Sequence, residues 1–197
     1  MRAILIILTI LFSGCTTIKP PVTEYSVATK DLKIDSVSSG CIDKSLKIAQ
    51  AFSSNSLMSV NMDYTQDSNR VFSYSQAEWR ESPNSLVTSE LLKSIGNSKL
   101  FGSVHPSKSR VKSDFILETN VEEFMQFYTQ DMQKSFVHVG FSLTLIDAKT
   151  NSVVKSQYFS SKFDAKTLDA QGGAEATQNA LFEIIFQSID WLGGVCK

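Results

Sequence analysis

The stretch Val137-His138-Val139-Gly140-Phe141-Ser142-Leu143-Thr144-Leu145 alternates large apolar residues with small or polar ones along its whole length. Successive side chains of a β-strand point to opposite faces of the sheet, so this pattern predicts a strand with one buried face and one more polar face. One-sided burial of this kind is typical of antiparallel sheets. The chain therefore needs a second layer to cover the apolar face of this strand.

The segments on both sides of this strand also predict β-structure. Apolar residues recur between Phe115 and Phe127, and Asp147-Ala148-Lys149-Thr150-Asn151 predicts a hairpin turn into a strand over 152–163. Shorter strands are expected over 24–28, 46–52, 57–64, 70–74 and 100–104, with a turn at 66–69.

Two segments predict helices that supply the covering layer. Ser82 and Pro83 form a strong helix start, with serine as the N-cap and proline at the first helical position, and Gly96 is the C-cap candidate. A second helix is expected from after Asp169 to about Leu192. Its core stripe is Leu181, Ile184, Ile185, Ile189 and Leu192, widened by Phe182 and Phe186. The order of elements predicts a single α+β domain, a mainly antiparallel sheet with two helices packed on one face.

The first fifteen residues have the layout of a bacterial lipoprotein signal peptide. A basic start at Met1-Arg2 is followed by an apolar run over 3–12 and by the small residues Ser13 and Gly14 directly before Cys15. We expect cleavage of residues 1–14, acylation of Cys15, a lipidated tether over 15–23 and a folded domain over 24–197. The apolar run is shorter than the roughly 20 residues of a membrane-spanning helix. An uncleaved anchor, or a plain secretory signal with a chance cysteine, is the alternative.

The residue after the lipidated cysteine bears on localisation. An Asp at that position retains a lipoprotein in the inner membrane by the familiar sorting rule, and here the position holds Thr16. The expected localisation is therefore the periplasmic face of the outer membrane, with the chain attached by its acyl groups.

The other two cysteines, Cys41 and Cys196, form an even pair in an oxidising compartment, so we predict a disulfide between them. Two free buried thiols are the alternative. No C-x-x-C spacing occurs in the chain.

Charge and motif content argue against several functional classes. The chain has 19 Lys and Arg against 20 Asp and Glu, and no basic block, which argues against nucleic acid as a partner. Its two histidines, His105 and His138, belong to no H-E-x-x-H pattern, and neither a G-x-S-x-G nor a P-loop pattern occurs. We therefore expect no catalytic site, no metal site and no cofactor.

The region from Val71 to Pro83 joins an aromatic-ended strand, Trp79 and a proline-started helix, and this order resembles the ABC-type transport auxiliary lipoproteins, the family of paraquat-inducible protein C. Further similar segments are Leu91–Gly96, Leu100–Val104, Ser113–Leu117, Leu145–Asp147 and Ala176–Leu192 with Trp191, besides Cys15 and the strand around Tyr25–Val27. The resemblance covers essentially all of the mature chain. Its motifs are diffuse and none is catalytic, and the Cys41–Cys196 pair is no hallmark of the family.

The resemblance implies a periplasmic accessory protein of a lipid-transport system, in which an ABC transporter works with MCE-domain proteins that bridge the inner and outer membranes. Its implied role is docking or assembly, and its implied partners are the membrane through acylated Cys15, an MCE-domain protein, the ABC transporter components and further copies of itself. Two other classes remain open: a lipoprotein that itself binds a lipid or other apolar ligand, and an enzyme. A deep apolar cavity between sheet and helices would favour ligand binding, whereas a flat apolar surface would favour docking.

Aromatic residues gather on the predicted strands, and some of them must lie on the face away from the helices because Phe124 and Phe127 have opposite parity. An exposed apolar patch would mark a partner or lipid surface. The candidates for this surface are Tyr74, Trp79, Phe124, Phe127, Tyr128 and Tyr158. Packing in the core is the alternative for each of them.

Overall fold

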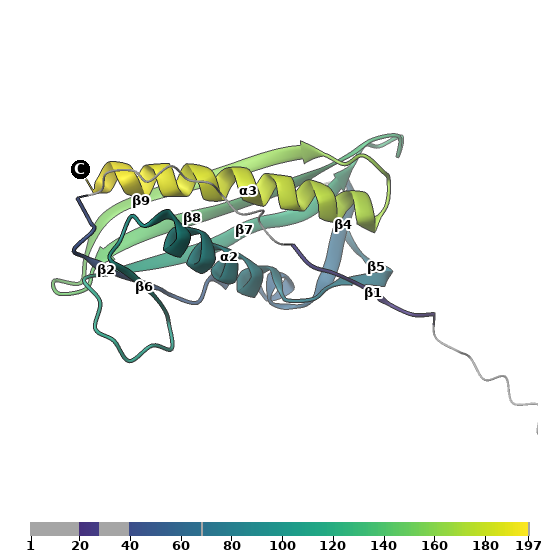
Figure 1. Cartoon of the computed structure of the whole chain (residues 1–197). Helices are drawn as coiled ribbons and strands as arrows, with labels where there is room; N and C mark the ends of the chain where they lie inside the picture. The colour runs from purple at the N-terminus through teal and green to yellow at the C-terminus, as the bar shows by residue number, and fades with distance from the viewer. Residues whose placement is uncertain (1–19, 28–39, 68, 197) are drawn as a thin grey trace, which may run out of the picture.

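The computed structural model describes residues 20–27, 40–67 and 69–196 (Figure 1). The predicted signal peptide, Cys15 and the first part of the predicted tether lie outside these residues. The strands are β1 (Thr23–Tyr25), β2 (Ser45–Ile48), β3 (Phe52–Ser53), β4 (Asn61–Asp67), β5 (Arg70–Trp79), β6 (Ser103–Pro106), β7 (Phe115–Tyr128), β8 (Ser135–Asp147) and β9 (Ser152–Asp164). The helices are the short 3-10 helix η1 (Asn55–Met58), α2 (Pro83–Ser98) and α3 (Ala170–Val195).

The sheet is mixed, and its long pairings are antiparallel. β7 pairs with β8 from Phe115↔Asp147 to Tyr128↔Ser135, β8 pairs with β9, and β4 pairs with β5, all antiparallel. The short strands add parallel pairs: β2, β3 and β4 with β7, β2 with β6, and β1 with β5. Parallel neighbours need a crossover connection, and the chain between β2 and β6 includes α2. The predicted α+β class is confirmed.

Both helices lie on the same face of the sheet (Figure 1). The alternation that starts in the sequence at Val137 is confirmed, because Val139, Phe141, Leu143 and Leu145 are fully buried beneath this layer. Fully buried side chains of the helices meet them: Leu91 and Ile95 of α2, and Leu181, Ile184, Ile185 and Leu192 of α3. Burial of one such side chain contributes roughly 1.5–3 kcal/mol, so this layer is the main source of stability.

Of two sequence predictions about α3, one is confirmed and one is wrong. The helix begins after Asp169, as the sequence predicts, and Asp169 is its N-cap, whose carboxylate accepts a hydrogen bond from the Gly172 N–H at 2.8 Å. Phe182 and Phe186, in contrast, are exposed, so the prediction that they widen the core stripe was wrong. The helix packs on one sheet only, and the arc of its surface that meets the sheet is too narrow to include these two rings.

The predicted ends of α2 are correct only in part. Pro83 begins the helix as predicted, but the Ser82 hydroxyl donates to Asn84 Oδ1 at 2.7 Å and does not cap a backbone N–H. Gly96 does not end the helix, which continues to Ser98 and closes on Lys99 in the left-handed conformation, with φ of 57°. The short strand after it begins at Ser103, three residues later than the sequence predicts.

Candidate functional site

The six aromatic candidates lie on two different faces of the sheet. Trp79 and Phe124 are only 5% and 3% exposed and pack edge to face, with ring centroids 5.6 Å apart. Tyr128 is buried as well. Trp79 and Phe124 belong to the helix-covered core, and Tyr128 is buried beside it, so the predicted place of these three residues on a monomer surface was wrong.

A β-bulge in β7 explains the outcome for Phe124 and Tyr128. Leu117, Thr119 and Val121 point to the core, but the register between β7 and β8 shifts between Val121 and Glu123. An extra residue at a bulge shifts the alternation by one position, so every later side chain of the strand points to the opposite face from the one that the earlier pattern predicts. Phe124 therefore turns inward after the bulge and Phe127 turns outward.

Tyr74 also lies on the covered face, in a polar cluster where β4, β5 and β7 meet. Its hydroxyl lies 2.6 Å from the Tyr128 hydroxyl and donates to Gln126 Oε1 at 3.0 Å. Gln126 in turn donates to Ser135 Oγ at 2.9 Å. Burial, and then the hydrogen bond with Tyr128, raises the pKa of Tyr74, so its hydroxyl stays protonated. The half-buried Tyr74 therefore has a structural role and is not a surface anchor.

Phe127 and Tyr158 lie on the face of the sheet that the helices leave open. Phe127 stacks on Phe136 of β8, with centroids 5.3 Å apart and ring planes 8° apart. Lys162 Nζ lies 5.5 Å from the centroid of the Phe136 ring, within reach of a cation–π interaction. Tyr158 is 43% exposed. We call Phe127, Phe136 and Tyr158 the open-face aromatics.

The absence of a side chain at Gly140 leaves room for one of these rings. A Cβ at Gly140 would collide with the Tyr158 hydroxyl, so the tyrosine ring occupies the space above the glycine backbone. The neighbouring His138 lies opposite Lys162 across β8 and β9. Partial burial, and then the charge of Lys162, lowers the pKa of His138, so its ring is neutral at pH 7.

The open face also contains an aromatic residue that the sequence did not indicate. Phe52 is 68% exposed on β3, beside a hollow of about 390 Å³. The hollow is lined by Ala49, Gln50, Phe52, Glu118, Thr119, Asn120, Ser142 and Thr144. Leu46 and Ile48 are buried and share the parity of Phe52, so an unbroken strand over 46–52 would place Phe52 in the core. The break between β2 and β3 reverses its orientation.

The predicted disulfide is confirmed. Cys41 and Cys196 are bonded, with Cα atoms 5.2 Å apart and a sequence separation of 155 residues. The bond joins the segment before β2 to the residue that ends α3. It therefore holds the early chain against the C-terminus of the domain.

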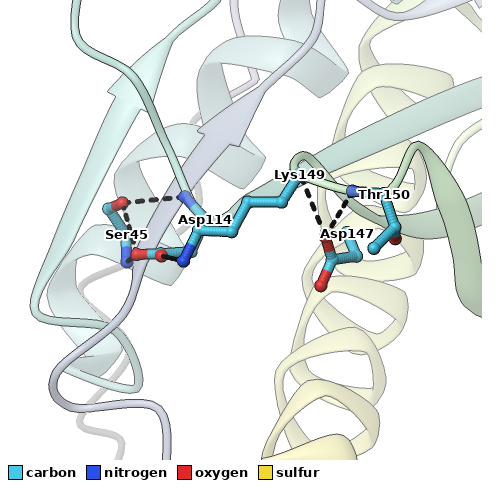
Figure 2. A network of polar contacts seen from close by, with 5 residues as sticks. All are labelled: Ser45, Asp114, Asp147, Lys149 and Thr150. Atoms are coloured by element: carbon cyan, nitrogen blue, oxygen red, sulfur yellow. Dashed lines mark hydrogen bonds and ion pairs between the residues drawn. The ribbon is translucent and has the colours of Figure 1, made fainter.

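A polar network holds three strand ends together (Figure 2). It includes Ser45 at the start of β2, four residues after the disulfide-bonded Cys41. The Asp114 carboxylate accepts hydrogen bonds from the Ser45 N–H at 3.0 Å and the Ser45 hydroxyl at 2.9 Å. Its other oxygen lies 3.3 Å from Lys149 Nζ. The Asp147 carboxylate accepts from the N–H groups of Lys149 and Thr150, which closes the β8–β9 turn. The starts of β2 and β7 are thereby tied to this turn.

These contacts make one element of stability depend on pH. Hydrogen bonds from Ser45, followed by Lys149, lower the pKa of Asp114 to about 2, below the roughly 3.9 of an unfolded aspartate. A depressed pKa stabilises the fold above the unfolded value, and the effect is lost as the pH falls through the folded value. We expect Asp114→Asn to lower the melting temperature at pH 7, and the difference from wild type to shrink between about pH 4 and pH 2. Scanning calorimetry across this range measures it, and a difference independent of pH would contradict the assignment.

The remaining sequence candidates are placed as follows. His105 lies on β6, where its Nε2 is 3.1 Å from the Ser103 hydroxyl. Across residues 20–27, 40–67 and 69–196, no group of three or more His, Cys, Asp or Glu side chains is arranged to hold a metal ion. No helix in this part of the chain is both long enough and apolar enough to cross a membrane. Cys15 lies outside the described residues.

Several solved structures are similar to this one at low sequence identity. Protein XCC0632 from Xanthomonas campestris, of the family DUF330, aligns over 88% of this chain and 96% of its own, with a TM-score of 0.79 and 16% identity. An uncharacterized protein aligns over 88% of this chain and 99% of its own, with a TM-score of 0.67 and 11% identity. Lipoprotein GNA1162 from Neisseria meningitidis aligns over 77% of this chain and 99% of its own, with a TM-score of 0.42 and 12% identity.

The first two likenesses establish a shared fold, and at these identities they assign no activity. No family model matches the sequence. No curated protein matches it either.

Proposed function

We propose that this chain is a periplasmic lipoprotein anchored to the outer membrane, which serves as a non-catalytic accessory component of an ABC/MCE-type lipid-transport system. The leader that ends in Ser13-Gly14-Cys15 supports the anchor. The resemblance of the Val71–Pro83 region and of the closing helix to the auxiliary lipoproteins supports the system. The observation that carries a docking role is the open sheet face, on which Tyr158 is 43% exposed and Phe127 and Phe136 are partly exposed. No helix of the described residues covers this face.

The packing between the helices and the sheet favours docking over enclosure of a ligand. Fully buried side chains from both layers meet there, among them Phe141, Leu91 and Leu181. The hollows around Phe52 and Phe127 lie at the surface instead. A partner therefore has the open face available to it without any rearrangement of the core.

Direct binding of a lipid is the second candidate, and one hollow favours it. A space of about 910 Å³ beside the β7–β8 turn is lined by Thr65, Phe127, Tyr128, Thr129, Gln130, Asp131, Lys134 and Phe136. It combines apolar rings with the ammonium group of Lys134, a combination that suits an amphipathic ligand.

Affinity purification of the full lipidated chain from detergent-solubilised membranes tests the proposal. We expect an MCE-domain protein and the ABC permease to copurify with the wild type. Phe127→Ala combined with Tyr158→Ala should reduce their recovery at least tenfold, because a few aromatic residues can dominate the binding energy at an interface.

Phe182→Ala combined with Phe186→Ala is the matched control, since it removes two exposed rings from the helix-covered side. It should leave recovery unchanged, and melting temperatures should show that both double variants are folded. Equal losses in the two variants would contradict docking through the open face. Recovery of the chain with bound lipid and no partner protein would favour the second candidate.

A further inference from the structure

We propose that one end of the sheet binds the surface of an anionic phospholipid bilayer. This end, which we call the basic end, comprises Lys44, Lys47, Lys108, Arg110, Lys112 and Lys149. It lies where β2, β6 and β7 meet the β8–β9 turn (Figure 1). The proposal is independent of acylation at Cys15 and of any transport partner.

The basic end has an excess of positive charge that the whole chain lacks. Its six basic residues face three acidic ones in the same loops, Asp43, Asp114 and Asp147, whereas the whole chain has a net charge of −1. Asp114 is paired with Lys149, and Asp147 accepts backbone hydrogen bonds of its own turn. Within the described residues, Arg110 and Lys112 have no ion-pair partner. Their charges are available to an external anion.

Three of the lysines surround one hollow. Lys47, Lys112 and Lys149 line a space of about 490 Å³ together with Ser113, Asp114, Ile116 and Ala148. Lys47 is held there by its hydrogen bond to the Ser109 carbonyl at 3.2 Å. Lys149 is paired with Asp114 in this hollow, whereas Lys112 has no ion-pair partner among the described residues. The Lys112 ammonium group is therefore suited to a phosphate oxygen, and phospholipid headgroups present such oxygens at high density.

Exposed aliphatic side chains lie among these charges, which favours a bilayer over an acidic protein surface. Val111, between Arg110 and Lys112, is 47% exposed, and Ile42, two residues before Lys44, is 53% exposed. Peripheral membrane segments combine basic side chains, which attract anionic headgroups, with aliphatic side chains that enter the boundary of the acyl region.

The scaffold holds this surface in place. Ile42 follows Cys41, which is bonded to Cys196, and the Lys44 N–H donates to the Cys41 carbonyl at 2.9 Å. The Gly102 N–H donates to the Lys44 carbonyl, also at 2.9 Å. The Ser45–Asp114 hydrogen bonds fix the other side of the surface (Figure 2). Binding therefore needs little ordering of the backbone, which lowers its entropic cost.

The basic end is a second point of contact, separate from the predicted lipid anchor. β7 begins at the basic end, β4 runs parallel to it, and β5 runs antiparallel to β4. Since β1 is parallel to β5, the chain enters β1 from the opposite end of the sheet (Figure 1). Contact at the basic end therefore adds to attachment through the N-terminus and does not duplicate it.

Vesicle flotation of the mature chain from residue 15, carrying Cys15→Ser so that no acyl chain contributes, tests the proposal. We expect binding to vesicles of three parts phosphatidylcholine to one part phosphatidylglycerol, weakening as salt rises from 25 to 300 mM, and no binding to pure phosphatidylcholine. Arg110→Gln with Lys112→Gln should weaken the association about 30-fold, because each basic residue near the surface contributes a factor of roughly five. Val111→Ser should weaken it at both salt concentrations.

Arg80→Gln with Lys166→Gln is the matched control, because it removes the same charge from exposed positions outside the basic end. It should change the association less than twofold. If the two double variants weakened the association equally, the effect would depend only on net charge, and the proposal would be overturned. Failure to float with the anionic vesicles, together with salt-sensitive retention on immobilised polyglutamate, would overturn it in favour of an acidic protein.

Discussion

Replacing Cys41 and Cys196 together with serine is expected to lower the free energy of unfolding by about 4–5 kcal/mol. The bond closes a loop with a sequence separation of 155 residues, and in the chain-entropy model a longer loop removes more freedom from the unfolded chain. Loss of this amount removes much of the 5–15 kcal/mol that stabilises a typical domain. Urea unfolding of the oxidised mature chain and of the double variant measures the difference.

Chemical reduction of the wild type supplies the control for this prediction. The reduced wild type should unfold at the same urea concentration as the double variant, because both lack the cross-link. Two thiols that react with an alkylating reagent in the native, unreduced protein would show that the bond is absent. A double variant as stable as the oxidised wild type would contradict the stabilising role.

Substitution of Cys15 by serine is expected to release essentially all of the protein from membranes into the soluble periplasm. Two or three acyl chains hold a lipoprotein stably, since each buried methylene contributes about 0.8 kcal/mol, and the substitution removes the site to which they attach. Cell fractionation with immunodetection measures the distribution.

The expected release applies at high salt, where contact through the basic end is weak. Cys41→Ser with Cys196→Ser is the control, since it changes cysteines without touching the predicted lipidation site. Sedimentation of the Cys15→Ser variant with membranes at high salt, to the same extent as wild type, would contradict lipid anchoring.

The sequence predicts the parts of this fold that depend on local periodicity. The alternation over 137–145 gives β8 and its buried face correctly, because a strand paired on both sides keeps its parity for as long as the ladder is regular. Pro83 and Asp169 mark two helix starts correctly because each acts within one turn of the chain. The disulfide follows from the count of cysteines and the expected compartment.

The predictions that fail concern features that depend on strand irregularities or on pairing between strands far apart in the chain. A single bulge after Val121 turns Phe124 inward and Phe127 outward, and nothing in the sequence locates that bulge. The parallel pairs of β2, β3 and β4 with β7 join segments far apart in the chain. The basic end could not be predicted from the sequence for the same reason. Its charges come from three separate segments, around residues 44–47, 108–112 and 149, none of which is a basic block.

Attachment of the mature chain to a membrane through Cys15 is the central claim of this account, and the mass of its N-terminal peptide tests it most directly. Mass spectrometry of the membrane-extracted protein should show a mature chain that begins at Cys15 and carries the added mass of two or three acyl chains. A chain that still begins at Met1, or one that begins near residue 15 without added mass, would contradict the account.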